Sequence, residues 1–169
     1  MSHLDTIKSL AKNIRIDILE MTSNANSGHP GGSLSATDIV AVLYGSILNY
    51  DSSNPKWESR DRFILSKAHA CPVLYAALAE TGYFDKSELM TFRKLNSRLQ
   101  GHAHIKTPGV EMSGGSLGQG LSFGVGVSLA AKVDQKNYRT FVLLGDGELN
   151  EGQVWEAIMS ANKYKLDNL

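Results

Sequence analysis

A carboxylate framed by two glycines stands near the end of the sequence, at Gly145-Asp146-Gly147. It follows the apolar run 140–144, which is typical of a buried strand, and precedes residues 153–165, whose apolar positions repeat at helical spacing. Glycines adopt positive φ and let the backbone approach phosphate oxygens, while a helix start offers free N–H groups to an anion. Asp146 would add a hard oxygen ligand of the kind that Mg²⁺ or Ca²⁺ prefers. The pattern favours a metal-bound diphosphate site. The alternative is a β-hairpin, because Asp-Gly is also a strong hairpin signal.

Four of the five histidines lie in loop or turn positions beside small residues, at His29, His69, His102 and His104. Imidazoles in such settings approach a ligand without steric cover and can move a proton near neutral pH. The repeated setting favours a shared polar site over four separate, hydrogen-bonded structural histidines. A zinc site is a further alternative, with ligands from His69, Cys71, His102 and His104, but no compact metal-binding spacing supports it.

Residues 114–124 form a second glycine-rich run that leads into a helix-like segment. The run is similar to a phosphate-cradling loop. It misses the dinucleotide-binding fingerprint, because Gly124 falls one position late and no clear strand precedes it. The same glycines would equally allow close packing of a helix. Both roles are consistent with the sequence.

Composition excludes several classes of protein. The 169 residues include 17 basic and 17 acidic side chains, a balance that gives no electrostatic case for nucleic acid or an anionic membrane surface. No segment is long and apolar enough to span a bilayer, and the first residues lack the features of a signal peptide. The one cysteine, Cys71, excludes an internal disulfide and suits a reducing cytoplasm. We expect a cytoplasmic protein with a single domain over residues 1–169.

Apolar spacing predicts helices and strands in alternation. We expect a helix over residues 4–21, a second helix capped by Ser35 or Thr37 and running through Ile47, and further helices over 73–80, 121–133 and 153–165. The capping-box spacing at Asp85 predicts one more helix, to about residue 95, and strands are expected over 62–65 and 138–144. This order indicates an α/β domain with a mostly parallel sheet flanked by helices. Ligands of such sheets bind outside the carboxyl ends of the strands, where both glycine-rich loops would lie.

Taken together, these segments resemble the thiamine-diphosphate-binding half of transketolases. The matching segments are Ser27-Gly28-His29-Pro30-Gly31, residues 61–70, Gly101-His102, Pro108-Gly109-Val110-Glu111, residues 115–120, and Gly145-Asp146-Gly147 with Glu151-Gly152. The resemblance covers nearly the whole chain and implies the thiamine-diphosphate-binding fold, of which this chain would hold the diphosphate-binding half. The start of the chain and the wording of residues 31–38 are similar to the N-terminal subunits of split transketolases, in which two polypeptides share the task.

The resemblance implies a role for each matched residue. Asp146 would ligate Mg²⁺ or Ca²⁺, with Gly145 and Gly147 at the diphosphate of the cofactor. His69 would reach the diphosphate side, and the thiamine pocket would be lined by Gly115, Ser116 and Leu117. The catalytic residues His29 and His102 would face the sugar and help proton movement. Glu151, counted with the cofactor site, and Glu156 match acidic positions that lie towards a subunit interface.

The chemistry implied by the resemblance is transfer of a two-carbon ketol unit between phosphosugars, with thiamine diphosphate as the electron sink. The family continues beyond the position of Leu169, and its second half supplies the glutamate that activates the cofactor. We therefore expect a chain truncated relative to the family, which works with a C-terminal, pyrimidine-binding subunit as a dimer or heterotetramer. Two alternatives stay open: a non-catalytic cofactor-binding or assembly module, and a related synthase acting on another aldehyde acceptor. Two departures from the family pattern, Ala68 and Ala103-His104, leave the matched histidines in place.

Overall fold

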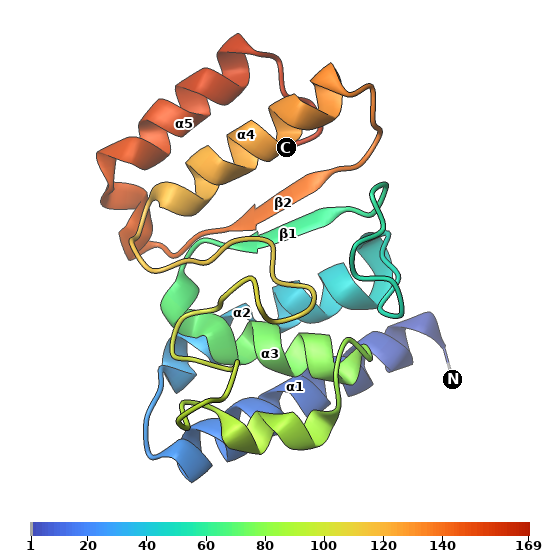
Figure 1. Ribbon diagram of the computed structural model, residues 1–169, viewed down its shortest axis with the longest axis vertical. Coiled ribbons are helices and arrows are strands. Elements are labelled where there is room, and N and C mark those ends of the chain that lie inside the picture. Colours follow the sequence, from blue (N-terminus) through green and yellow to red (C-terminus); the bar gives the residue numbers. More distant parts are fainter. Residues whose placement is uncertain (1) are drawn as a thin grey trace.

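A two-stranded parallel sheet runs through the middle of the molecule, with helices on both of its faces (Figure 1). The structure is a computed structural model and describes residues 2–169, so Met1 of the predicted domain lies outside the described residues. Strands β1 (Arg62–Leu65) and β2 (Thr140–Leu143) pair in parallel, with Arg62 opposite Thr140 and Leu65 opposite Leu143. The predicted α/β class and the parallel pairing are confirmed.

The helices divide into two layers (Figure 1). One face of the sheet is covered by α1 (His3–Ala25), α2 (Pro30–Val42) and α3 (Cys71–Glu80), and the other by α4 (Gln119–Val133) and α5 (Gly152–Lys163). Short turns of other helix types connect them: the π-helical η1 (Leu43–Ile47) and the 3₁₀ turns η2 (Ala68–Ala70), η3 (Lys86–Thr91) and η4 (Gly147–Asn150). In the part of the chain that the structure describes, no helix has the length and apolar character needed to cross a bilayer.

The start of α2 differs from the prediction. The helix begins at Pro30, and neither Ser35 nor Thr37 caps it, since both lie within the helix. Their hydroxyls instead donate to helix carbonyls, from Ser35 to Gly32 at 3.0 Å and from Thr37 to Ser33 at 3.2 Å. Proline suits the first turn of a helix because its φ is already helical and its missing N–H would have had no partner there. The Pro-Gly-Gly run, which the predicted cap placed before the helix, therefore forms its first turn.

The helix predicted from Asp85 to about residue 95 is also wrong, because only the 3₁₀ turn η3 forms there. Asp85 accepts a hydrogen bond from the Ser87 backbone N–H at 2.8 Å. Glu88, the expected second half of a capping box, pairs instead with Arg98 at 2.7 Å. Arg93 then adopts a positive φ of 60°, a conformation that an α-helix does not contain. A local cap is thus present without the helix that it was expected to begin.

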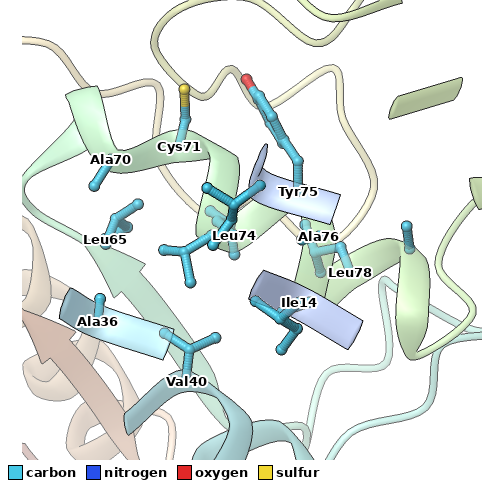
Figure 2. Close-up of a cluster of buried hydrophobic side chains, with 14 of the residues drawn as sticks. Ile14, Ala36, Val40, Leu65, Ala70, Cys71, Leu74, Tyr75, Ala76 and Leu78 are labelled. Atoms are coloured by element: carbon cyan, nitrogen blue, oxygen red, sulfur yellow. The ribbon is translucent and has the colours of Figure 1, made fainter. Parts of the chain in front are cut away.

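Most of the apolar core lies between the sheet and the α1–α3 layer, as Figure 2 shows. Ile14 of α1, Val40 of α2 and Leu74 of α3 are buried there together with Leu65 of β1. The α4–α5 layer has a much smaller core, in which the buried residues are Leu121, Val154 and Ala157. The sequence places apolar residues all along α5, and the fold buries only part of them. Trp155 is 56 % exposed and Met159 is 65 % exposed, and Ile158 beside them is also exposed.

Candidate functional site

Three segments meet at the carboxyl ends of the two strands. Residues 66–70 follow β1, residues 145–151 follow β2, and the glycine-rich loop 114–118 leads into α4. Gly145 is followed by the 3₁₀ turn η4 and then by α5, so the hairpin alternative is wrong. Both glycine-rich loops thus lie at the edge of the sheet where ligands of parallel α/β domains bind, as predicted.

Glu148 joins these three segments, a role that sequence reasoning missed. Its side chain is buried, with 2 % of its surface exposed. The carboxylate accepts hydrogen bonds from the Ser66 hydroxyl at 2.5 Å and from the backbone N–H groups of Gly118 and Gly145 at 2.9 Å each. Nothing in the residue type of Glu148, or in its position two residues after Asp146 in a polar turn, distinguishes it from a solvent-exposed carboxylate. Only the packing of α4 against the sheet makes it a buried acceptor.

The glycines of the run 114–124 differ in their surroundings: some allow close packing of a helix, and others leave the backbone open. A Cβ atom on Gly120 would lie 2.7 Å from the Ser66 Cα, and one on Gly124 would lie 2.6 Å from a methyl group of Val142, so these two glycines allow α4 to pack closely. Gly115 is exposed, and a Cβ there would meet no atom within 4 Å. Its backbone is therefore accessible to a ligand. Gly118 has a positive φ of 81° at the start of α4.

The turn around Asp146 is open to solvent. Asp146 and Gly147 are exposed, and a Cβ on Gly147 would meet no atom within 4 Å. Neither Gly145 nor Gly147 has a positive φ, so the expectation that they would adopt it is wrong. The absence of a side chain at Gly147 leaves its backbone accessible to a ligand, next to the exposed carboxylate of Asp146. Such a pair of groups fits a divalent cation that takes its remaining oxygen ligands from phosphate and water.

Two of the predicted histidines lie side by side. His29 directly precedes α2 and His69 lies in η2, and their ring centroids are 5.2 Å apart in an edge-to-face arrangement. Desolvation lowers the pKa of His69, and the proximity of His29 and Lys67, with a smaller effect from His102, lowers it further against the opposing effect of Glu148. His69 is therefore largely neutral near pH 7. His102 is exposed in the same region, whereas His104 accepts a hydrogen bond from the Lys106 backbone 3.1 Å away in a local turn.

Lys67 is a second residue that the sequence did not single out. It is buried, and its ammonium group donates to the Gly32 carbonyl at 3.1 Å and to the Ser35 hydroxyl at 3.4 Å. Its aliphatic chain lies beside Gly145, where a Cβ atom would be 3.6 Å from the Lys67 Cδ. The lysine thus connects the start of α2 with the turn after β2. It brings a positive charge to a region where we expect an anionic ligand.

The remaining predicted residues lie along the exposed rim of this edge. Ser116 and Leu117 are exposed on the glycine-rich loop. Glu151 directly precedes α5. A Cβ atom on Gly118 would lie 2.9 Å from the Cβ of Glu151, so the glycine-rich loop and the start of α5 are in contact. Glu156 is exposed one turn later. The structure therefore brings the two glycine-rich loops and two of the histidines to one edge of the sheet.

The zinc alternative does not agree with the geometry. Across residues 2–169, no three His, Cys, Asp or Glu side chains come together in a group that could hold a metal ion. Cys71 is fully buried, and desolvation raises the pKa of its thiol to about 12. Its sulfur donates to the carbonyls of Gln100 and Gly101 at 3.4 Å and 3.1 Å. A zinc ligand would have to be a thiolate, which this environment opposes.

The edge of the parallel sheet thus carries an exposed carboxylate, two glycines with open backbones, and imidazole and ammonium groups. This combination suits an anionic ligand. The chain belongs to the transketolase family: residues 6–169 match the family described as "Transketolase, thiamine diphosphate binding domain". Recognition of this family from the motifs is confirmed.

Relatives of known function share this similarity over nearly the whole chain. The transketolase of Homo sapiens is 46 % identical over 167 residues, which is 98 % of this chain and 27 % of that protein. An apulose-4-phosphate transketolase subunit from Phocaeicola vulgatus is 41 % identical over 166 residues, which is 98 % of this chain and 59 % of that protein. The crystal structure of transketolase from Campylobacter jejuni superimposes with a TM-score of 0.93 at 39 % identity, covering 98 % of this chain and 27 % of that one. The chain thus spans about a quarter of the length of several full transketolases.

Proposed function

We propose that this chain is the diphosphate-binding component of a transketolase, which transfers a two-carbon ketol unit between phosphosugars. The observation that carries the proposal is the meeting of the Asp146 turn, the glycine-rich loop and the pair His29 and His69 at one edge of the sheet. Thiamine diphosphate would supply the electron sink for the reaction. The chain's own residues would bind and orient it and move protons.

Each predicted residue has a place in this proposal. Asp146 would hold Mg²⁺ or Ca²⁺, and the exposed backbone at Gly147 would donate to the diphosphate with Gly145 beside it. The accessible segment Gly115, Ser116 and Leu117 would lie along the thiamine. Neutral His69 would act as a hydrogen-bonding group on the diphosphate side, since the surrounding positive charges oppose its protonation.

The exposed histidines would serve the sugar. His29 and His102 both lie open to solvent, on different loops, in the region of His69. An exposed imidazole can bind a hydroxyl or carbonyl group of a phosphosugar and exchange a proton with it near neutral pH. We assign these two residues the catalytic proton movements of the reaction.

A second polypeptide or a second copy would complete the site. Trp155, Ile158 and Met159 expose apolar surface on α5, next to Glu151 and Glu156 at its start. A contiguous apolar face of this kind is typical of a subunit interface. One relative is itself named as a subunit of a transketolase, which supports a C-terminal, pyrimidine-binding partner and a dimer or heterotetramer. Cys71 is a buried free thiol, which supports the proposed cytoplasmic location.

Calorimetry with thiamine diphosphate tests the cofactor site directly. We expect binding that requires Mg²⁺ or Ca²⁺ and is weak in this chain alone, because Asp146 is one carboxylate and leaves most of the metal's coordination shell to phosphate and water. Asp146→Asn should weaken binding by about tenfold or more, since it removes the charged ligand. Asp134→Asn, at the exposed end of α4, is the matched control and should bind as the wild type does. Tight binding without metal, or equal binding by the Asp146 variant, would contradict the assignment.

Ketol transfer in a mixture with a candidate C-terminal subunit tests the catalytic roles. His29→Ala and His102→Ala should lower the rate of transfer and leave the affinity for the cofactor nearly unchanged. His104→Ala is the control, because His104 makes only a local contact with Lys106. Robust turnover by a monomer of this chain without a partner would contradict the proposed assembly.

A further inference from the structure

Glu148 is a buried carboxylate at the sheet edge, and none of the roles assigned to the cofactor and sugar sites uses it. We propose that Glu148 is a positioning residue that holds the three segments of the cofactor site in their relative places. The proposal rests on the function proposed above, since it concerns the same site. It assigns to Glu148 no contact with the cofactor or the sugar.

The geometry gives each oxygen of the carboxylate a defined task. Oε1 accepts from the Ser66 hydroxyl at 2.5 Å and from the Gly118 N–H at 2.9 Å, and Oε2 accepts from the Gly145 N–H at 2.9 Å. These donors lie 82, 30 and 3 residues away along the chain. One side chain therefore connects the loop after β1, the glycine-rich loop and the turn after β2.

Every segment held by Glu148 carries residues of the proposed site within a few positions. Ser66 precedes the loop of Lys67 and His69, Gly118 follows Leu117, and Gly145 precedes Asp146. A binding group acts well only when its supporting contacts fix its place to a fraction of an ångström. Since two of the three hydrogen bonds go to backbone N–H groups, the carboxylate fixes the course of the chain itself, not merely a side chain.

A carboxylate is the side chain that this arrangement needs. It offers only acceptors, and all three groups that face it donate. Glu148→Gln replaces one of the two acceptor oxygens by an NH₂ group, which is a donor. In one orientation of the side chain this group would face the Gly145 N–H, and in the other it would face the Gly118 N–H. Ser66 can rotate its hydroxyl, but a backbone amide cannot. The isosteric change must therefore release one of the two glycine-bearing segments. Hydrogen bonds to a charged acceptor are also about twice as strong as neutral ones.

Three variants separate positioning from general stability. We expect Glu148→Gln to bind thiamine diphosphate with Mg²⁺ about tenfold or more weakly, the effect of losing one charge-assisted hydrogen bond and freeing a loop. Ser66→Ala should bind the cofactor about threefold more weakly at most, since both backbone amides keep their hydrogen bonds to Glu148. Gly124→Ala is a matched control: it disturbs the packing of α4 on Val142, away from the carboxylate, and should bind as the wild type does even if it unfolds more easily.

Amide hydrogen exchange measured by NMR provides a readout that needs no cofactor. In the wild type, the Gly118 and Gly145 amides should exchange much more slowly than the amide of Gly147, which is exposed at the start of η4. In Glu148→Gln, one of the two slow amides should become fast, while amides within α1 keep their wild-type rates. In Gly124→Ala, both should stay slow.

The possible failures are distinguishable. If the wild type binds no thiamine diphosphate with Mg²⁺, the proposed function is contradicted, and this inference falls with it. If the wild type binds and folded Glu148→Gln binds equally well, only the inference is overturned. If Glu148→Gln does not fold, Glu148→Asp replaces it, because it keeps the charge but shortens the reach by one methylene. Wild-type affinity in Glu148→Asp, or fast exchange at both glycine amides in the wild type, overturns the inference.

Discussion

The contact between α4 and the loop after β1 can be tested by adding one methyl group. A Cβ atom on Gly120 would lie 2.4 Å from the Ser66 Oγ and 2.7 Å from its Cα. The hydroxyl could turn away, but the Cα is backbone, so α4 or the loop must move. Gly120→Ala should therefore destabilise the fold, although alanine is the better helix former.

The magnitude follows from two opposing effects. Forcing an extra methyl group into a packed contact costs about 1–3 kcal/mol, and a backbone neighbour places this case in the upper half of that range. The gain from replacing glycine by alanine in a helix is about 0.5–1 kcal/mol. We expect a net loss of about 1–2.5 kcal/mol in the free energy of unfolding. For a chain of this size, that corresponds to a fall of about 2–10 °C in the melting temperature.

The same helix contains its own control. Gly126 lies in the interior of α4 and is exposed, and a Cβ there would meet no atom within 4 Å. Gly126→Ala should stabilise the protein by about 0.5–1 kcal/mol, since only the propensity effect applies. The stability of Gly124→Ala should lie between those of the Gly120 and Gly126 variants, because its Cβ would meet a methyl group of Val142, which can shift. Urea unfolding followed by circular dichroism measures all three. A Gly120 variant as stable as the Gly126 variant would refute the reasoning.

Three further predictions concern the buried residues Asp17 and Cys71 and the half-buried Arg93. Desolvation raises the pKa of Asp17 to about 6, despite Lys86 at 2.9 Å, so this carboxyl stabilises the fold fully below about pH 4 and loses that contribution as the pH rises through 6. Asp17→Asn should therefore gain stability relative to the wild type as the pH rises from about 4 through about 6 in urea titrations, and a difference that is constant over this range would contradict the reasoning. Cys71 should react with a thiol reagent on the order of a hundredfold more slowly in the native protein than in urea, because its thiol is buried; equal rates would count against the packing of α3. The Arg93 guanidinium packs against Gly101, where a Cβ atom would be 2.7 Å from its Nη2. Arg93→Ala should therefore speed amide exchange in the His102 loop, whereas Arg15→Ala should not.

Features that depend on short-range pattern could be predicted from the sequence. The limits of β1, the helical character of α4 and α5 and the turn after β2 follow from hydrophobic spacing and glycine placement, and the structure has them close to where they were expected. The motifs also pointed to the correct family, because family-specific loops lie in order along one chain. Local pattern was less reliable at helix ends. A cap was expected at Ser35 or Thr37, but α2 begins at Pro30, and Asp85 was expected to begin a helix but begins only a 3₁₀ turn.

Which distant residues meet depends on the fold as a whole. Glu148 and Ser66 are 82 residues apart, and they form a hydrogen bond because β1 and β2 pair in parallel and bring together the segments that follow them. The neighbouring rings of His29 and His69 depend in the same way on how α2 approaches the end of β1. The division of the glycines into packed positions, such as Gly120, and open ones, such as Gly115, is set by what surrounds each of them. Hydrophobic periodicity and turn residues indicate the secondary structure that a segment can form by itself. Burial depends on the residues that the fold brings against that segment from elsewhere in the chain.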